Sequence, residues 1–212
     1  MNASIRLADR SDADAMQEIY SPIVHDTHIS FEWTVPEVGE IESRILRTLA
    51  QYPWLVCVID DQLAGYAYAG SFRSRYAYQW TAETTVYIHP EFQRRGVATA
   101  LYHSLIAIMR AQGYCTAVGV IALPNAGSIR AHEALGFRKI GVFKNAGFKA
   151  GSWRDTGWWQ LDLRPMPESP QPPRAISEVA NDEDFAGHLA AGLPFIRRLE
   201  KRQSHVKQQA TD

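Results

Sequence analysis

The sequence of 212 residues has only two cysteines, Cys57 and Cys115, and each lies within an apolar run. So few cysteines exclude a disulfide scaffold and a cysteine-rich zinc site, and they favour buried, reduced thiols. No apolar stretch approaches the ~20 residues that a membrane-spanning helix needs. Residues 1–12 lack the apolar core of a signal peptide. We therefore expect a cytoplasmic protein with no membrane partner.

The sequence also lacks an excess of charge of either sign, since 22 Lys and Arg residues stand against 23 Asp and Glu residues. A formal net charge of −1 argues against a nucleic acid or an acidic membrane surface as a partner. No two histidines have the His-x-x-x-His spacing, so we expect no metal site. Hydrophobic residues make up 46% of the chain and charged residues 21%, which is typical of a folded globular protein.

Apolar periodicity and turn residues predict the elements of a single α/β domain. Short strands are expected at residues 4–7, 54–59, 63–69, 83–88 and 116–122, and near 138–144 and 156–163. Helices are expected around residues 13–20, 41–49, 97–111 and 128–135, while residues 21–36, with Pro22 and Pro36, are expected to be irregular. This order predicts a mixed, mostly antiparallel central sheet flanked by helices.

Five prolines crowd residues 165–173, and such a segment is extended and unsuited to a sheet interior or a helix. We therefore place the boundary of the main domain there, with residues 1–164 forming that domain. Residues 165–212 form a Pro-rich linker and a C-terminal tail. The spacing of Ile176, Val179, Leu189 and Leu193 leaves open whether the tail is helical or disordered.

The sequence from Gln93 to Ala98 leads from a predicted strand through a turn into a helix. The first N–H groups of a helix have no partner inside the helix, and they lie at the positive end of its dipole. Gly96 has no Cβ and Ala98 only a methyl group, so a bulky anion can approach the backbone. The residues that we expect to bind a pyrophosphate here are Arg94, Arg95, Gly96, Val97, Ala98 and Thr99.

This loop, Asn125 and the sequence Ala134-Leu-Gly-Phe137 together resemble the Gcn5-related N-acetyltransferase (GNAT) superfamily over residues 4–163. Six further stretches resemble its phosphinothricin N-acetyltransferase family, whose relatives acetylate methionine sulfone and methionine sulfoximine. These are Tyr52-Pro-Trp-Leu-Val56, Ala67-Tyr-Ala-Gly70, Thr84-Thr-Val-Tyr87, Leu123-Pro-Asn125, His132-Glu-Ala-Leu-Gly136 and Gly151-Ser-Trp153.

The resemblance implies a GNAT fold, acetyl-CoA as cosubstrate, a role in detoxification, and a homodimer with the active site near its interface. The loop at Gly96 would then bind the pyrophosphate of acetyl-CoA. The backbone of Val86, Tyr87 and Ile88 would pair with the pantetheine amides like an added strand, and one N–H there would polarise the thioester carbonyl. Asn125 would hydrogen-bond the pantetheine.

Acetyl transfer to an amine needs a proton acceptor, because an ammonium group has no lone pair. A carboxylate in an apolar strand has a raised pKa that suits a general base, and Glu83 occupies such a position. The glutamate at this position is also the proposed base in the resembling family. His132 stands where the superfamily often has a tyrosine acid. It can act either as a second base or as the acid for the thiolate.

The acceptor side of the site is predicted from the loop before Glu83. Arg75 can hold a substrate carboxylate with two parallel hydrogen bonds, Tyr78 can add a hydroxyl, and Phe31 can line the pocket. We therefore expect direct acetylation of the α-amine of a small amino-acid analogue. The alternatives are an acetyltransferase for another small amine or a peptide N-terminus, or a non-catalytic CoA-binding module.

Overall fold

Seven apolar or alternating stretches form the strands of one sheet in the computed structural model, which describes residues 1–197. The strands are β1 (Ala3–Leu7), β2 (Trp54–Ile59), β3 (Gln62–Ser71), β4 (Thr81–Ile88), β5 (Thr116–Ala122), β6 (Arg138–Lys149) and β7 (Ser152–Asp162). Their order is β1-β2-β3-β4-β5-β7-β6. All neighbours pair antiparallel except β4 and β5, which are parallel. The sheet is mixed and mostly antiparallel, as the sequence predicts.

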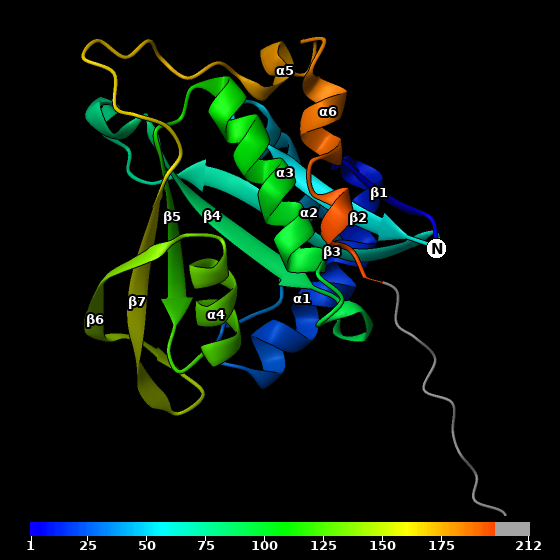
Figure 1. Cartoon of the computed structure of the whole chain (residues 1–212). Coiled ribbons are helices and arrows are strands. Elements are labelled where there is room, and N and C mark those ends of the chain that lie inside the picture. The colour runs from blue at the N-terminus through cyan, green and yellow to red at the C-terminus, as the bar shows by residue number, and fades with distance from the viewer. Residues whose placement is uncertain (198–212) are drawn as a thin grey trace, which may run out of the picture.

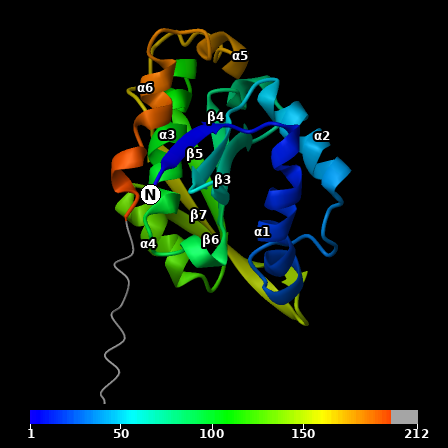
Figure 2. The ribbon, with the colours of Figure 1, turned by 90° about the vertical axis from the view of Figure 1, so that its right-hand side faces the viewer.

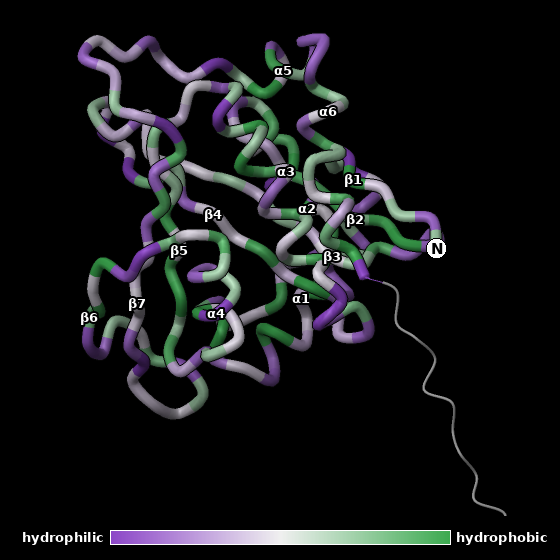
Figure 3. Tube along the Cα trace, viewed as in Figure 1, coloured by the Kyte–Doolittle hydropathy of each residue, from purple (hydrophilic) through white to green (hydrophobic). Residues whose placement is uncertain are grey.

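Helices cover both faces of this sheet, so the molecule has three layers (Figure 2). The helices are α1 (Ala13–Asp26), α2 (Val38–Leu49), α3 (Val97–Gln112), α4 (Ala126–Ala134), α5 (Ile176–Val179) and α6 (Phe185–Ala190). Helices α1 and α2 lie on one face, and α3, α4 and the C-terminal helices lie on the other. The green, hydrophobic stretches of Figure 3 run along the strands and the inner sides of the helices.

Two buried clusters hold the layers together. The larger lies between the sheet and α3, where Leu101, Leu105 and Ile108 are fully buried at helical spacing. The smaller lies between the sheet and α1 and α2, around Met16 and Ile45. Each fully buried aliphatic side chain contributes about 1.5–3 kcal/mol to stability. The helices therefore hold the sheet from both sides and fix the positions of the strand ends that build the site.

The expectation that residues 21–36 are irregular is wrong for residues 21–26, because α1 runs through Pro22 to Asp26. A proline removes one hydrogen bond from a helix interior. Here the buried side of the helix continues past it, since Ile19, Tyr20 and Val24 all pack inward. The apolar contacts on both sides of Pro22 offset that loss, which a local reading of the sequence does not capture.

The segment after β7 folds back over α3, and we call residues 165–197 the C-terminal segment. It contains α5, α6 and a short turn at Leu193–Phe195. In α5, Ile176 and Val179 are buried. Figure 1 shows α6 lying beside α3 on the outside of the molecule, and α3 and α6 are in contact. Residues 198–212, the rest of the predicted tail, lie outside the described residues.

Candidate active site

The site lies where β4 and β5 separate. Thr81–Thr84 of β4 pairs in parallel with Thr116–Gly119 of β5. Beyond these residues the two strands diverge (Figure 1). On its other side β4 stays paired with β3 as far as Ile88. No strand among residues 1–197 pairs with the β5-facing side of Thr85–Ile88. The backbone groups on that side can therefore bind an extended ligand in the manner of an added strand.

Two adjoining cavities open along this gap, and they share six lining residues. The first, of about 540 Å³, is lined by the candidate residues Phe31 and Glu83. The second, of about 740 Å³, extends to the N-terminus of α3. Its lining includes the candidate residues Ile88, Arg94, Gly96, Val97, Ala98 and Thr99. Val86, Tyr87, Asn125 and His132 line both cavities, so the structure brings most of the predicted site together.

The N-terminus of α3 faces the second cavity without a side chain of its own to cap it. Gly96 is the N-cap residue, with φ of 80°, and no side chain accepts from the first N–H groups of the helix. Asn125, by contrast, caps α4 by accepting a hydrogen bond from the Ser128 N–H at 3.1 Å. Arg94 also has a positive φ, of 60°. The uncapped amides at the positive end of the α3 dipole therefore suit a phosphate.

Gly96 is required here for a different reason from the expected approach of an anion. A Cβ on this residue would overlap the carbonyl oxygen of Phe195, which belongs to the C-terminal segment. The positive φ is a second reason, because side chains disfavour it. Arg95 does not line either cavity. Its guanidinium lies 4.8 Å from the centre of the Phe92 ring, so only Arg94 of the two arginines faces the site.

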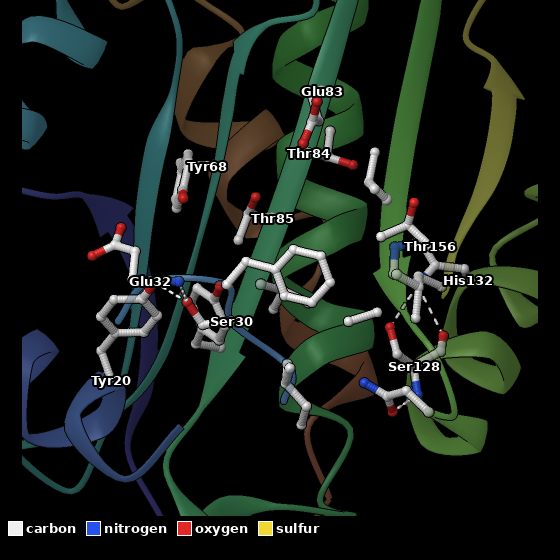
Figure 4. A pocket seen from close by; sticks show the side chains of 18 of the residues that line it. Tyr20, Ser30, Glu32, Tyr68, Glu83, Thr84, Thr85, Ser128, His132 and Thr156 are labelled. Atoms are coloured by element: carbon white, nitrogen blue, oxygen red, sulfur yellow. Dashed lines mark hydrogen bonds between the residues drawn. The ribbon is translucent and has the colours of Figure 1, made fainter. Parts of the chain in front are cut away.

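Glu83 reaches the first cavity from the middle of β4, where it pairs with Gly70 of β3 and Val118 of β5. Burial raises the pKa of its carboxyl group, and the positive charge of Arg73 partly opposes this shift. A raised pKa brings a carboxylate closer to the value of an efficient general base at neutral pH. Figure 4 shows Glu83 and His132 on different sides of the cavity, one on β4 and the other on α4.

His132 is buried, with 5% of its surface exposed, and both ring nitrogens have partners. Nδ1 lies 2.8 Å from the carbonyl oxygen of Ser128, so it must carry the proton and donate it. Nε2 then accepts from the Tyr102 hydroxyl at 2.9 Å. The Tyr102 oxygen in turn lies 3.3 Å from the Thr84 hydroxyl. Burial lowers the pKa of His132, which keeps the ring neutral near pH 7.

The wall of the first cavity opposite His132 is formed by Tyr20 of α1 and the loop after it (Figure 4). The Tyr20 hydroxyl lies 2.6 Å from that of Ser30. Arg44 of α2 donates to the Glu32 carboxylate at 2.6 Å. A third hydrogen bond comes from β6, where the Lys149 ammonium group donates to the Glu32 carbonyl oxygen. Three elements therefore hold this loop in place.

Arg75 and Tyr78, the predicted acceptor-binding pair, line neither cavity. Arg75 precedes a short helical turn at Tyr76–Tyr78, and Tyr78 packs edge-on against Phe72. Arg73 of the same loop also lines neither cavity, but its positive charge partly opposes the rise in the pKa of Glu83. Only Ser74 separates Arg73 from Arg75, and the path of the loop distinguishes them.

Sequence reasoning missed the buried hydroxyl groups of the site. Tyr102 is fully buried in α3, and Thr84 and Tyr68 also line the first cavity. A partial signal exists for Tyr102, because its hydroxyl lies on an otherwise apolar side of a helix and a buried hydroxyl needs a partner. That partner is 30 residues away on α4 and cannot be identified from local sequence.

Residues 1–197 contain no group of three His, Cys, Asp or Glu side chains arranged to hold a metal ion. Within the same residues, no helix has the length and hydrophobicity needed to cross a membrane.

Comparisons with known proteins identify the family of this chain. Residues 5–158 match the family model of the acetyltransferase (GNAT) domain. The chain belongs to the GNAT acetyltransferase family. It is therefore an acetyl-CoA-dependent N-acetyltransferase by family.

Individual relatives cover most of the chain. It is 38% identical over 175 residues to a phosphinothricin N-acetyltransferase of Streptomyces viridochromogenes, which covers 82% of this chain and 95% of that protein. It is 35% identical to an L-methionine sulfoximine/L-methionine sulfone acetyltransferase of Salmonella typhimurium, over 76% of this chain and 94% of the relative.

Among solved structures, a GNAT superfamily phosphinothricin acetyltransferase from Sinorhizobium meliloti in complex with acetyl-CoA matches with a TM-score of 0.76. The two chains are 32% identical, and the match covers 83% of this chain and 99% of the other.

Proposed function

We propose that this GNAT enzyme acetylates the α-amine of a small amino-acid analogue of the phosphinothricin, methionine sulfone or methionine sulfoximine type. The observation that carries the proposal is the first cavity, of about 540 Å³, which holds a half-buried carboxylate and adjoins the gap between β4 and β5. Its size suits a small molecule. The names of the relatives supply the acceptor class. We further propose that the enzyme is cytoplasmic and detoxifies such analogues.

The residues of the second cavity fit acetyl-CoA, which supplies the thioester. The α3 amides and Arg94 bind the phosphates, and the free side of Thr85–Ile88 pairs with the pantetheine. Asn125 uses its Oδ1 to cap α4, and its amide nitrogen is left to donate to the pantetheine. A backbone N–H of β4 polarises the thioester carbonyl.

Glu83 takes the first proton, from the ammonium group of the acceptor, and releases it to solvent. This leaves a neutral amine that attacks the thioester carbon directly. Tyr102 and His132 transfer the second proton, which the nitrogen loses after its attack on the thioester. As the Tyr102 oxygen accepts a proton from the amine nitrogen, its own proton passes to His132 Nε2 along the 2.9 Å hydrogen bond. The same path returns the proton to the departing sulfur. A neutral His132 suits acceptance.

Arg73 is our candidate for the acceptor carboxylate, in place of Arg75. Its positive charge partly opposes the rise in the pKa of Glu83, so we expect a carboxylate bound to it to lie near the base. A guanidinium binds a carboxylate through two parallel charge-assisted hydrogen bonds. Arg75 lies in the same loop and provides the matched comparison, since neither arginine lines a cavity and only Arg73 affects the pKa of Glu83.

The test measures CoA release with phosphinothricin, methionine sulfone, methionine sulfoximine, their amides, simple amines and an alanine-terminated peptide. We expect release with the free amino acids and a fall of ~10²–10⁴-fold in turnover for Glu83→Gln, with unchanged affinity for acetyl-CoA. Arg73→Ala should reduce the specificity constant for the acids far more than for the amides, whereas Arg75→Ala should leave both specificity constants nearly unchanged.

Preference for simple amines or the peptide would overturn the acceptor assignment. Acetyl-CoA binding with no release would identify a non-catalytic module.

A homodimer is also part of the proposal. Strand β6 is the last strand of the sheet, and the β6–β7 hairpin exposes several large apolar side chains. These are Ile140, Phe143, Phe148 and Trp153. An exposed apolar group on an edge strand favours association with another chain, and a second copy is the partner that we propose.

A further inference from the structure

The C-terminal segment follows α3 from its end to its beginning. Near the end of α3, the Gln112 side chain donates to the Arg174 carbonyl oxygen at 2.9 Å, and the Arg174 N–H donates to the Gln112 carbonyl oxygen at 2.8 Å. The described chain stops at Arg197, whose N–H donates to the Arg95 carbonyl oxygen at 2.9 Å. The segment therefore ends at the loop that precedes α3, which lines the second cavity.

Close backbone contacts show that this docking is specific. The buried Ser104 hydroxyl of α3 donates to the Leu189 carbonyl oxygen at 2.7 Å and accepts from the Gly192 N–H at 3.1 Å. Gly192 lies so close to α3 that a Cβ on it would overlap the carbonyl oxygen of Ala100. A side chain larger than hydrogen at position 192 is therefore incompatible with the docked segment.

The last residues of the segment contact the phosphate-binding end of α3 directly. The Phe195 ring stacks on His103, with ring centres 3.9 Å apart and planes 6° apart. The Phe195 carbonyl oxygen fills the space beside Gly96 where a Cβ would stand. Gly96 is therefore the N-cap of α3 and also lines the second cavity. It is at the same time the residue that the Phe195 carbonyl oxygen of the segment contacts.

This segment begins after the part of the chain that the family model matches, because the GNAT model ends at residue 158. The match to the Streptomyces viridochromogenes relative spans 175 residues and takes up 95% of that protein but 82% of this chain, so part of this chain has no counterpart in that relative. The shared family fold therefore does not account for the contacts at Gly96 and Arg95.

We propose that the C-terminal segment positions the phosphate-binding loop of this enzyme, so that docking of the segment and binding of the acetyl-CoA phosphates stabilise each other. The proposal rests on acetyl-CoA binding at the second cavity. Residues 192–197 act through the loop at Arg94–Gly96 and do not themselves touch the reacting atoms.

The loop needs this support for two physical reasons. Arg94 and Gly96 both have positive φ, and Arg94 has a side chain that disfavours this conformation. Surrounding contacts must therefore hold it. The Arg95 carbonyl oxygen is also a partial negative charge in a loop that would face phosphates. The hydrogen bond from the Arg197 N–H satisfies that oxygen and reduces its repulsion of an anion.

The test compares two donors on full-length variants, acetyl-CoA and S-acetylpantetheine, which lacks the pyrophosphate and the nucleotide. Gly192→Val should displace the segment by its clash with Ala100. Its φ of −86° accepts valine, so the effect is steric and not conformational. Gly187→Val is the matched control, because Gly187 lies in the same segment with open space around it. Phe195→Ala removes the stacking on His103 without adding any atoms.

We expect Gly192→Val to lower kcat/KM for acetyl-CoA by about 10-fold or more through KM, with kcat nearly unchanged and with S-acetylpantetheine affected less than about twofold. Phe195→Ala should act in the same direction more weakly, and Gly187→Val should resemble the wild type. Equal losses on both donors, or no loss in a folded Gly192→Val protein, would overturn the proposal. A wild type that binds no acetyl-CoA would instead refute the proposed function.

A second measurement uses the unchanged protein, and it does not depend on any variant folding. Because coupling between two sites is reciprocal, acetyl-CoA should slow hydrogen exchange at the amides of Gly192 and Arg197. S-acetylpantetheine at saturating concentration should not. Exchange at these amides that is the same with and without acetyl-CoA would overturn the proposal.

Discussion

The position of His132 depends on a glycine across the gap. Gly119 of β5 lies beside the imidazole, and a Cβ there would stand 2.7 Å from both Cδ2 and Nε2 of His132. That separation is too short for two unbonded heavy atoms. A glycine in a strand interior costs stability, and here the close approach of a side chain explains it. Gly119 is therefore a positioning residue for the Tyr102–His132 pair.

We expect Gly119→Ala to displace the His132 ring and break its hydrogen bond with Tyr102. The turnover number should fall by ~10²-fold or more, as for the loss of an acid–base group. The KM for acetyl-CoA should change little. Gly141→Ala on β6 is the control, because a Cβ there meets nothing within 4 Å. A turnover number within about threefold of the wild type would show that this hydrogen bond is dispensable.

Glu83 should cost stability at neutral pH. Because burial raises its pKa, the folded protein binds this proton more tightly than the unfolded chain does. The stability that the protonated carboxyl supplies is present below the unfolded pKa of about 4.3, and it is lost as pH rises through the folded value. At pH 7 the ionised, partly desolvated carboxylate therefore destabilises the fold.

Glu83→Gln should accordingly be more stable than the wild type at pH 7, and the difference should shrink toward zero as pH falls to about 4. Urea denaturation of both proteins at the two pH values measures this. A constant difference at both values would show that the substitution acts through packing. The pKa of Glu83 would then not be raised in the folded protein, as the catalytic proposal requires.

At the scale of elements, the β6–β7 hairpin contacts the loop after α1, which lines the first cavity. Lys149 is 7% exposed, and its ammonium group donates to the Glu32 carbonyl oxygen 117 residues away in the sequence. On the same hairpin, Gly147 lies against the Phe31 ring, where a Cβ would clash. The shape of the first cavity, where we propose that the acceptor binds, therefore depends on the packing of the hairpin against this loop.

Lys149→Met should loosen this loop, because it leaves the Glu32 carbonyl oxygen without its charged donor. A hydrogen bond to a charged group contributes roughly 1.5–3 kcal/mol, so we expect the KM for the amino-acid acceptor to rise about 10-fold. The KM for acetyl-CoA should be unchanged. Lys144→Met on the same hairpin removes an exposed ion pair with Asp155 and should have little effect. Equal rises in both KM values would contradict the assignment.

At the scale of the whole molecule, the exposed hairpin predicts association. Trp153 is 62% exposed, and its ring lies 5.6 Å from that of Phe148. Light scattering should give a mass of about twice 23.8 kDa for the wild type and close to 23.8 kDa for Trp153→Glu. Met166→Glu, which changes an exposed apolar residue elsewhere, should leave the mass unchanged. A monomeric wild type would exclude the dimer.

Local sequence was enough to predict the sheet, which the structure confirms, and to propose residues that the structure brings to the two cavities. Strand and helix periodicity depends on side chains two to four residues apart, and the loop from Gln93 to Ala98 lies within one such stretch. Glu83 was singled out as a carboxylate in an apolar strand, and His132 through the resemblance to the GNAT superfamily. All of these residues, except Arg95, line the cavities as expected.

Only the tertiary structure decided which distant groups meet. Tyr102 joins His132 across 30 residues, Lys149 joins Glu32 across 117, and the C-terminal segment returns to Gly96. The same holds for Arg73 and Arg75, which local sequence does not separate. Such contacts depend on how layers pack and where loops run, because neither hydrophobic periodicity nor turn chemistry reaches beyond a few residues. The residues proposed to bind acetyl-CoA could therefore be predicted from the sequence, whereas the contacts that support them and the shape of the first cavity could not.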